Sequence, residues 1–235
     1  MSFGAGYTFL RSYLLRDLPE VSFPTKFGEA GWRVGSAIVN YDLTYYLSLI
    51  ADLRLAGLFD ALVAIAARRP AVVLEIGGGF GGLACLIRKL VPNSHYIVVD
   101  LPESLVFSVP YLGTLFPQDS LALVNGDGGA ERPAVPDFTF VPNHRVDAVR
   151  GANLRVDLAV NTMSLDEMAP HQVEGYARLL SEVLADGAFF FEVNVDHVVP
   201  PLSRHLRQIA PPSPWARSER AVLWRDTKKI RYWQA

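Results

Sequence analysis

The chain has 235 residues, half of them hydrophobic, and a formal net charge of −2, which is enough sequence for one α/β domain with a small elaboration. The near-neutral charge gives no electrostatic basis for binding nucleic acid or an anionic membrane surface. The first residues lack the basic start and long apolar core of a signal peptide, and no apolar run is long enough to span a bilayer, so we expect a cytoplasmic protein. The single cysteine, Cys85, excludes disulfides and thiolate zinc sites within the chain.

Residues 1–69 are expected to form an N-terminal helical and irregular cap. The first 39 residues are rich in aromatic residues, Gly and Pro, which predicts a short helix near residues 10–15 followed by irregular chain. From Asn40 the apolar residues recur at helical spacing, which predicts one helix and then a second over residues 58–67. Tyr41 is a candidate cofactor contact and Tyr45 a candidate acceptor contact, because aromatic faces attract a sulfonium cation. The alternative for both is plain packing of the helix against a sheet.

The stretch 71–100 reads strand, glycine turn, helix, strand, acid. Residues 72–76 form an apolar, β-branched run that fits a strand buried on both faces. Five glycines follow within six residues, and a second apolar run over residues 96–99 stops at Asp100. Glycines let a ligand approach the backbone, the helix start offers free N–H groups, and the acid can accept hydrogen bonds from two ribose hydroxyls.

This unit fits two ligand classes. Gly77, Gly79 and Gly82 satisfy the dinucleotide pattern G-x-G-x-x-G. Glu75, Gly77, Gly79 and Gly81 satisfy E-x-G-x-G-x-G, the first motif of class I S-adenosyl-L-methionine-dependent methyltransferases. Glu75 and the long segment before the first strand favour S-adenosyl-L-methionine. A glycine-rich turn that holds no ligand is the remaining alternative.

The next segments complete the expected sheet. A helix is predicted over residues 102–115, with Pro110 bending or interrupting it. Residues 121–124 and 138–141 both look like strands, and we expect only the second to enter the core sheet, with Asn143 at its tip against the adenine. The rival adenine contact is Asn125-Gly126-Asp127.

The second half supplies the other strands. Residues 156–160 predict a strand ending at Asn161, Pro170 opens a helix closed by Asp186-Gly187, and residues 188–193 predict a fifth strand. Residues 221–224 and 230–233 look like a hairpin. Residues 70–235 are therefore expected to form a doubly wound, seven-stranded Rossmann-like methyltransferase sheet, with all parallel strand tips on one edge.

Three segments carry a resemblance to a known family. EIGGGFGGLA, VVDLPESL and DLAVNTMSLDEM resemble segments of the bacterial sugar O-methyltransferases, and the resemblance covers roughly residues 40–194. The resemblance implies a class I fold, S-adenosyl-L-methionine as the donor, and a sugar or sugar-containing small molecule as the acceptor. It also implies roles for single residues: Glu75, Gly77 and Gly79 at the methionine moiety, Asp100 and the adjoining Leu101 at the ribose, and the loop 161–168, with Asn161 against the cofactor and Ser164 against the acceptor.

Methyl transfer to a hydroxyl needs positioning of the acceptor and a base. His171 is the first candidate base, because it follows Pro170 at the helix start and imidazole accepts protons near neutral pH. Glu167 is the second, as a base or an acceptor-binding carboxylate. The alternatives are an exposed helix-start residue for His171 and a first-turn acid near the helix dipole for Glu167.

Asn194 and His197 follow the fifth strand and are candidate contacts for acceptor hydroxyls. No spacing of His and acids indicates a metal site, so no metal is expected. N-methylation of an amino sugar is the nearest alternative function. A nicotinamide-dependent oxidoreductase and a non-catalytic member of the fold are further alternatives, and a homodimer stays open.

Overall fold

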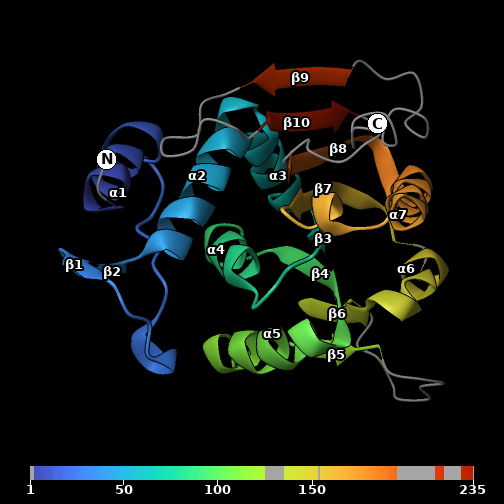
Figure 1. Ribbon diagram of the computed structural model, residues 1–235, viewed down its shortest axis with the longest axis horizontal. Helices are drawn as coiled ribbons and strands as arrows, with labels where there is room; N and C mark the ends of the chain where they lie inside the picture. Colours follow the sequence, from blue (N-terminus) through green and yellow to red (C-terminus); the bar gives the residue numbers. More distant parts are fainter. Residues whose placement is uncertain (1–2, 125–134, 153, 195–214, 220–228, 235) are drawn as a thin grey trace.

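The computed structural model describes residues 3–124, 135–152, 154–194, 215–219 and 229–234. Its centre is an eight-stranded sheet in the order β5-β6-β4-β3-β7-β8-β10-β9 (Figure 1). The strands are β3 (Ala71–Ile76), β4 (Ser94–Asp100), β5 (Leu121–Leu123), β6 (Phe138–Pro142), β7 (Val156–Thr162), β8 (Leu184–Asn194), β9 (Trp215–Glu219) and β10 (Lys229–Gln234).

The strand count exceeds the expected seven by one, because both of the β-like runs before Asn143 enter the sheet. β6 pairs with β4 as expected, and β5 pairs in parallel with the outer side of β6, with Leu121 opposite Phe138. The six neighbouring strands β5, β6, β4, β3, β7 and β8 are therefore all parallel. β10 pairs antiparallel to both β8 and β9. The expected hairpin exists, but the partner of β10 is Trp215–Glu219, and residues 221–224 lie outside the described residues.

Helices cover both faces of the sheet, which is the doubly wound arrangement that the sequence predicted. β3 is buried along its whole length because its alternating side chains enter the two separate hydrophobic clusters. One face carries α2 (Tyr41–Leu55), α3 (Leu58–Ala66), α4 (Gly82–Leu90) and α5 (Pro102–Leu115), and the other carries α6 (Asp147–Gly151) and α7 (Pro170–Val183) (Figure 1).

The N-terminal segment differs in detail from the prediction. The first helix begins earlier than expected, as α1 (Phe3–Phe9) running into a π-helical turn η1 (Leu10–Leu14), and a 3₁₀ turn η2 (Thr25–Phe27) follows. The expected irregular chain contains a hairpin, β1 (Trp32–Val34) and β2 (Ala37–Val39), joined by the two-residue turn Gly35-Ser36. Leu10 and Val39 are fully buried in the same cluster as α2. A separate cap ending at residue 69 stays a prediction.

Two helices also differ from the prediction, one in its interior and one at its end. α5 runs without interruption through Pro110. The N–H that proline lacks would face the carbonyl of Val106, a residue that is 68% exposed, so solvent can replace that bond. α7 ends at Val183, before Asp186-Gly187, because β8 already begins at Leu184. No helix of the described residues has the length and apolarity needed to cross a membrane.

Candidate functional site

A cleft of about 420 Å³ opens at the carboxyl edge of the parallel sheet. Because parallel strands end on one side, residues from separate parts of the chain meet there: Gly77 after β3, Asp100 at the end of β4 and Thr162 at the end of β7. The first turns of α7 close the other side. The predicted site residues that line the cleft are Gly77, Gly79, Asp100, Leu101, Asn143, Ser164 and Glu167.

The glycine turn after β3 requires glycine for two different reasons. Gly77 has φ +78, and a Cβ there would lie 2.2 Å from the Ser164 Oγ atom, so this glycine lets the turn pack directly against the loop after β7. Gly79 has φ +55, and a Cβ there would meet nothing within 4 Å. At Gly77 the turn is therefore in close contact with the loop after β7. At Gly79 it faces open space in the cleft.

Asp100 is tied to the same turn. Its two carboxylate oxygens accept hydrogen bonds from the backbone N–H groups of Gly79 and Leu101, both at 2.7 Å. A carboxylate offers about four acceptor positions, so these two bonds leave capacity for hydroxyl donors from the cleft. The end of β4 and the glycine turn thus form one continuous wall.

Two buried asparagines lie beneath the loop after β7. Asn161 Nδ2 donates to the Ile76 carbonyl at 2.7 Å and to Ser164 Oγ at 2.5 Å, and Asn194 Nδ2 donates to Asn161 Oδ1 at 2.9 Å. Asn161 and Asn194 are 0% and 1% exposed, and neither lines the cleft. Their amides hold the strand ends together, so the structure does not bring them to the ligand surface where the sequence had suggested cofactor and acceptor contacts.

The turn after β7 is conformationally unusual. Met163 has φ +57, a value that no other non-glycine residue in the described part of the chain shares. Its N–H donates to the Val193 carbonyl at 2.8 Å, and Ser164 packs against Gly77 as described above. β8 therefore holds Met163, and the glycine turn after β3 holds Ser164, and both residues line the cleft.

Glu75 lies under the glycine turn instead of in the cleft. It is 1% exposed, and its Oε2 accepts a 2.9 Å hydrogen bond from the Tyr96 hydroxyl. Burial raises the pKa of Glu75 to about 8, with Asp100 adding to the rise and the bond from Tyr96 opposing it. A Cβ at Gly78 would lie 3.2 Å from Glu75 Oε2, so this carboxyl supports the turn from below.

The other predicted residues divide as follows. Glu167 is exposed and lines the cleft, whereas His171 is exposed but does not line it. Tyr41 and Tyr45 stack on each other at 6.0 Å with an interplanar angle of 4°, inside an aromatic group with Tyr46, and neither lines the cleft. His197 and the rival adenine segment 125–127 lie outside the described residues.

Gln172 and Tyr176, one helical turn apart on α7, line the cleft and were missed as site residues. Burial raises the pKa of Tyr176, and the charge of Asp100, which lines the same cleft, adds to the rise. Their spacing of four along a helix beginning at the ligand edge is the signal that could have found them.

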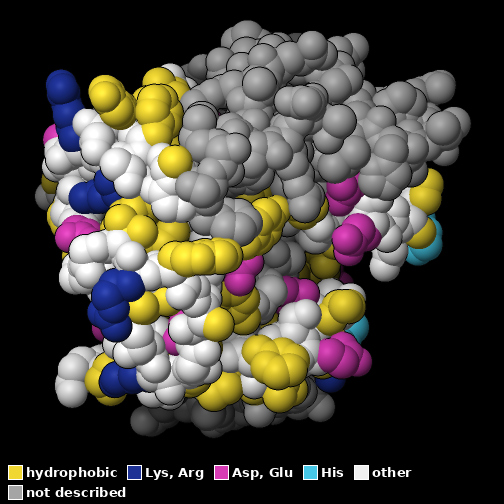
Figure 2. Space-filling view, turned by 60° about the vertical axis from the view of Figure 1, so that its left-hand side comes forward, with side chains coloured by type: hydrophobic (Ala, Val, Ile, Leu, Met, Phe, Trp, Pro, Cys, Tyr) yellow, Lys and Arg dark blue, Asp and Glu magenta, His cyan; other side chains and the backbone are white. Residues whose placement is uncertain are grey.

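On the face shown in Figure 2, acidic side chains lie among hydrophobic ones, and the basic side chains gather along one side. Within the described residues, no group of three or more His, Cys, Asp or Glu side chains is arranged to hold a metal ion.

Comparison with known proteins identifies the fold. No protein-family model matches the chain, and no curated protein matches it. Among solved structures it is similar to an rRNA methylase from Streptococcus thermophilus, with a TM-score of 0.53 and 10% identity over 77% of this chain and 95% of that one. It is also similar to a TehB-like SAM-dependent methyltransferase from Corynebacterium glutamicum, with a TM-score of 0.50 and 13% identity over 80% of this chain and 95% of that one.

A third similar structure is an O-methyltransferase family protein from Burkholderia thailandensis, with a TM-score of 0.51 and 11% identity over 82% of this chain and 59% of that one. At these identities the likeness concerns the fold and not the substrate. The chain has the fold of the class I S-adenosylmethionine-dependent methyltransferases.

Proposed function

We propose that this protein transfers the methyl group of S-adenosyl-L-methionine to a hydroxyl of a sugar or sugar-containing small molecule. The observation that carries the proposal is the joint wall formed by the glycine turn and Asp100, at the tips of adjacent strands in one cleft. The similar solved structures support S-adenosyl-L-methionine as the cofactor. The sugar acceptor rests on the family resemblance of the sequence.

The residues of the cleft fit this cofactor. A volume of about 420 Å³ lies within the range of small-molecule sites, roughly 300–1,000 Å³. Asp100 keeps free acceptor positions for ribose hydroxyls, and Gly79 presents open space beside it. Asn143 and Tyr176 line the part of the cleft beyond Asp100 and are suited to the adenine.

The protein's own groups then have three tasks. When bound, S-adenosyl-L-methionine supplies an activated methyl group on a sulfonium. Met163 and Met168 give the cleft wall an apolar part that excludes water, and the fixed loop positions the acceptor. Glu167, exposed on the cleft wall, accepts the proton of the acceptor hydroxyl in this proposal. His171 is the second candidate for that step.

A calorimetric titration with S-adenosylhomocysteine and, separately, with NAD⁺ tests the cofactor. We expect binding of the first and none of the second, and binding of NAD⁺ alone would instead support the oxidoreductase. Asp100→Asn should weaken S-adenosylhomocysteine, whereas Glu103→Asn, an exposed acid on α5 outside the cleft, should not.

Single-turnover methyl transfer to a panel of nucleotide-linked sugars, amino sugars, glycosylated small molecules and RNA tests the acceptor. Mass spectrometry of the product locates the new methyl group on oxygen or nitrogen. Transfer to a sugar oxygen is the expected result. Transfer to a sugar nitrogen would favour the amino-sugar alternative, transfer to RNA would overturn the small-molecule acceptor, and cofactor binding with no transfer would favour a non-catalytic member of the fold.

A further inference from the structure

A second cavity, of about 230 Å³, lies on the α6 side of the sheet and shares no lining residue with the cleft. Ile97 of β4 and Val141 of β6 lie on its sheet side, and Ala148 and Val149 of α6 lie opposite them. Ala122 of β5 lies opposite Thr139 in the strand register and also lines the space. The cavity walls are thus mainly apolar.

One polar pair interrupts these apolar walls. His95, which is 2% exposed, has its Nε2 atom 2.9 Å from the Thr139 hydroxyl oxygen, and both residues line the cavity. Burial lowers the pKa of His95 to about 4, with Asp137 opposing the shift, so the imidazole is neutral near pH 7. Among the described residues, Nδ1 of His95 has no hydrogen-bond partner.

The hydrogen-bonding groups of His95 and Thr139 indicate which polar group a ligand in this cavity would carry. If the His95 ring donates to Thr139, the threonine hydroxyl keeps its own hydrogen to donate, and if Thr139 donates to the ring, its oxygen keeps lone pairs to accept. Thr139 is the half-buried member of the pair, so its oxygen is the one that a ligand can reach. A ligand hydroxyl both donates and accepts, and it therefore matches either tautomer.

The size of the cavity selects the apolar part. An apolar cavity of roughly 150 Å³ stays dry and binds benzene. A volume of about 230 Å³ has room for one ring with small substituents. We propose that the cavity between β4–β6 and α6 is a second ligand site, which binds a small single-ring aromatic alcohol with its hydroxyl on Thr139 and its ring against the aliphatic walls.

The test uses p-cresol as the probe and toluene, which lacks the hydroxyl, as the matched ligand, both titrated into the full chain by ¹H–¹⁵N NMR. We expect p-cresol to shift the amide signals of β4, β6 and α6. Thr139→Val removes the hydroxyl at almost constant volume, so it should weaken p-cresol about tenfold and leave toluene unchanged. Ala122→Leu fills the cavity and should abolish the binding of both, whereas Ala64→Leu, at an exposed position of α3, should change neither.

The outcomes separate cleanly. No binding of p-cresol to the folded wild type at millimolar concentration overturns the proposal, and so does an equal effect of Thr139→Val on p-cresol and toluene. If Ala122→Leu fails to fold, as judged by far-UV circular dichroism, the Thr139→Val comparison alone decides. The result does not depend on methyl transfer, because the cavity and the cleft have no lining residue in common.

Discussion

Tyr96 donates its hydroxyl hydrogen to the carboxyl of Glu75 across 2.9 Å, and both side chains are buried beneath the glycine turn. Burial raises the pKa of Glu75 from 4.5 to about 8. Between these values the folded state holds one proton more than the unfolded state. By linkage the free energy of unfolding therefore falls as the pH rises through this window, by roughly 1.4 kcal/mol for each pH unit.

Glu75→Gln tests this pH dependence. Glutamine has the shape of the protonated acid and can still accept from Tyr96, but it does not titrate. From about pH 5.5 to about pH 7.5, urea unfolding should show that the wild type loses roughly 2–3 kcal/mol more stability than the variant. Glu103→Gln, at an exposed position, should follow the wild type. Parallel pH profiles for the wild type and Glu75→Gln would show that Glu75 is ionised in the fold.

The sequence could predict the turn above Glu75 but not the depth of its carboxyl. Five glycines after an apolar strand indicate a ligand-binding turn through local spacing alone. Whether an acid at the end of that strand reaches the ligand or lies under the turn depends on which face it occupies and on what packs there. Here the partner is Tyr96, on the next strand, and no spacing within residues 75–82 contains that information.

Gly77→Ala and Gly79→Ala should separate folding from binding. The Cβ at Gly77 would collide with Ser164, and its φ is positive, so this variant should lose about 2 kcal/mol or more in urea unfolding. Gly79 carries only the cost of a positive φ, about 1–2 kcal/mol, because its Cβ meets open space in the cleft. Gly79→Val should stay folded by circular dichroism yet lose S-adenosylhomocysteine binding in calorimetry. Normal binding by that folded variant would remove the turn from the cofactor site.

Asp100→Ala should weaken S-adenosylhomocysteine by about one to two orders of magnitude, because charge-assisted hydrogen bonds contribute roughly 1.5–3 kcal/mol. The substitution also frees the N–H groups of Gly79 and Leu101, so Asp100→Asn, which keeps one acceptor oxygen, belongs in the same calorimetric series. Asp60→Ala on α3, outside the cleft, is the control. Unchanged affinity in both Asp100 variants would place the ribose elsewhere.

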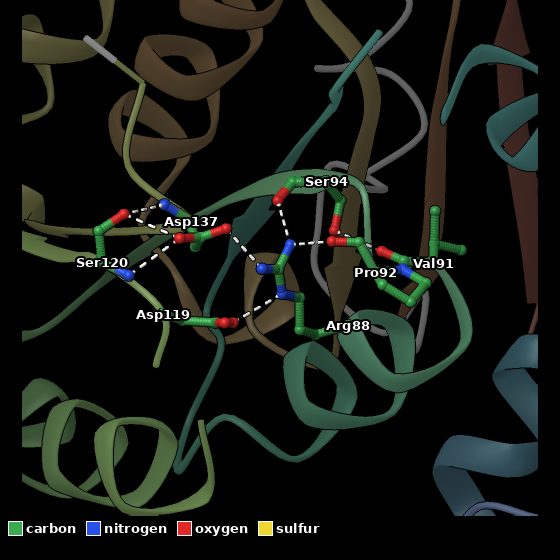
Figure 3. Close-up of polar contacts among 7 residues, drawn as sticks. All are labelled: Arg88, Val91, Pro92, Ser94, Asp119, Ser120 and Asp137. Carbon is green, nitrogen blue, oxygen red and sulfur yellow. Dashed lines mark hydrogen bonds and ion pairs between the residues drawn. The ribbon is translucent and has the colours of Figure 1, made fainter. Parts of the chain in front are cut away.

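Arg88 forms hydrogen bonds and ion pairs with several segments at the amino edge of the sheet, opposite the cleft. Its guanidinium donates to Asp119 at 2.7 Å and to the Ser94 carbonyl at 2.7 Å, and it also contacts Asp137 and the Pro92 carbonyl (Figure 3). Asp137 also accepts hydrogen bonds from the backbone and side chain of Ser120. Burial raises the pKa of Asp137, but the hydrogen bonds from Ser120 and the charge of Arg88 lower it more, so the pKa lies below its usual value. One side chain of α4 therefore joins the starts of β4, β5 and β6.

Arg88→Met should lower the free energy of unfolding by about 2–4 kcal/mol, near or just below the 3–5 kcal/mol of a fully buried pair because Asp119 and Asp137 keep some solvent contact. Arg88→Lys should not restore stability, since an ammonium lacks the fork that reaches four partners. Arg54→Met breaks a more exposed pair with Asp17 and should cost about 0–1 kcal/mol. Equal losses in urea unfolding for Arg88→Met and Arg54→Met would contradict this role.

The differences between the predicted and the observed fold have similar physical causes. The run 121–123 is an ordinary β pattern, but its pairing with β6 and the contacts of Arg88 with Asp119 and Asp137 beside it join segments far apart in the sequence, which local spacing does not contain. The β1–β2 hairpin was detectable, because its strands flank the two-residue turn Gly35-Ser36. The prediction of irregular chain there rests instead on the aromatic, Gly and Pro content of the first 39 residues. Tyr176 shares its helical spacing with the buried residues Val173, Ala177 and Leu180 of α7, yet it also lines the cleft, so spacing alone does not separate core from site at this position.

Glu167 is the residue for which geometry and chemistry agree best. It is exposed, it lines the cleft, and it follows the Met163–Ser164 turn that Asn161 and Gly77 hold in place. A general base typically contributes ~10²–10⁴ in rate. Glu167→Gln should therefore leave S-adenosylhomocysteine affinity near normal and lower single-turnover methyl transfer by about that range.

His171→Ala is the informative partner of that experiment. His171 stands four residues further along and outside the cleft wall, so its loss should change the rate less than Glu167→Gln does. The assay uses saturating acceptor, identified from the panel, and follows the rate from about pH 4 to about pH 9, a range in which both carboxyl groups and imidazoles ordinarily titrate, because loss of a base removes the acidic limb of the profile. A larger effect of His171→Ala would reverse the assignment. Full turnover in both variants would place the base elsewhere, and Asp196 and His197, which lie outside the described residues, would be the next pair to substitute.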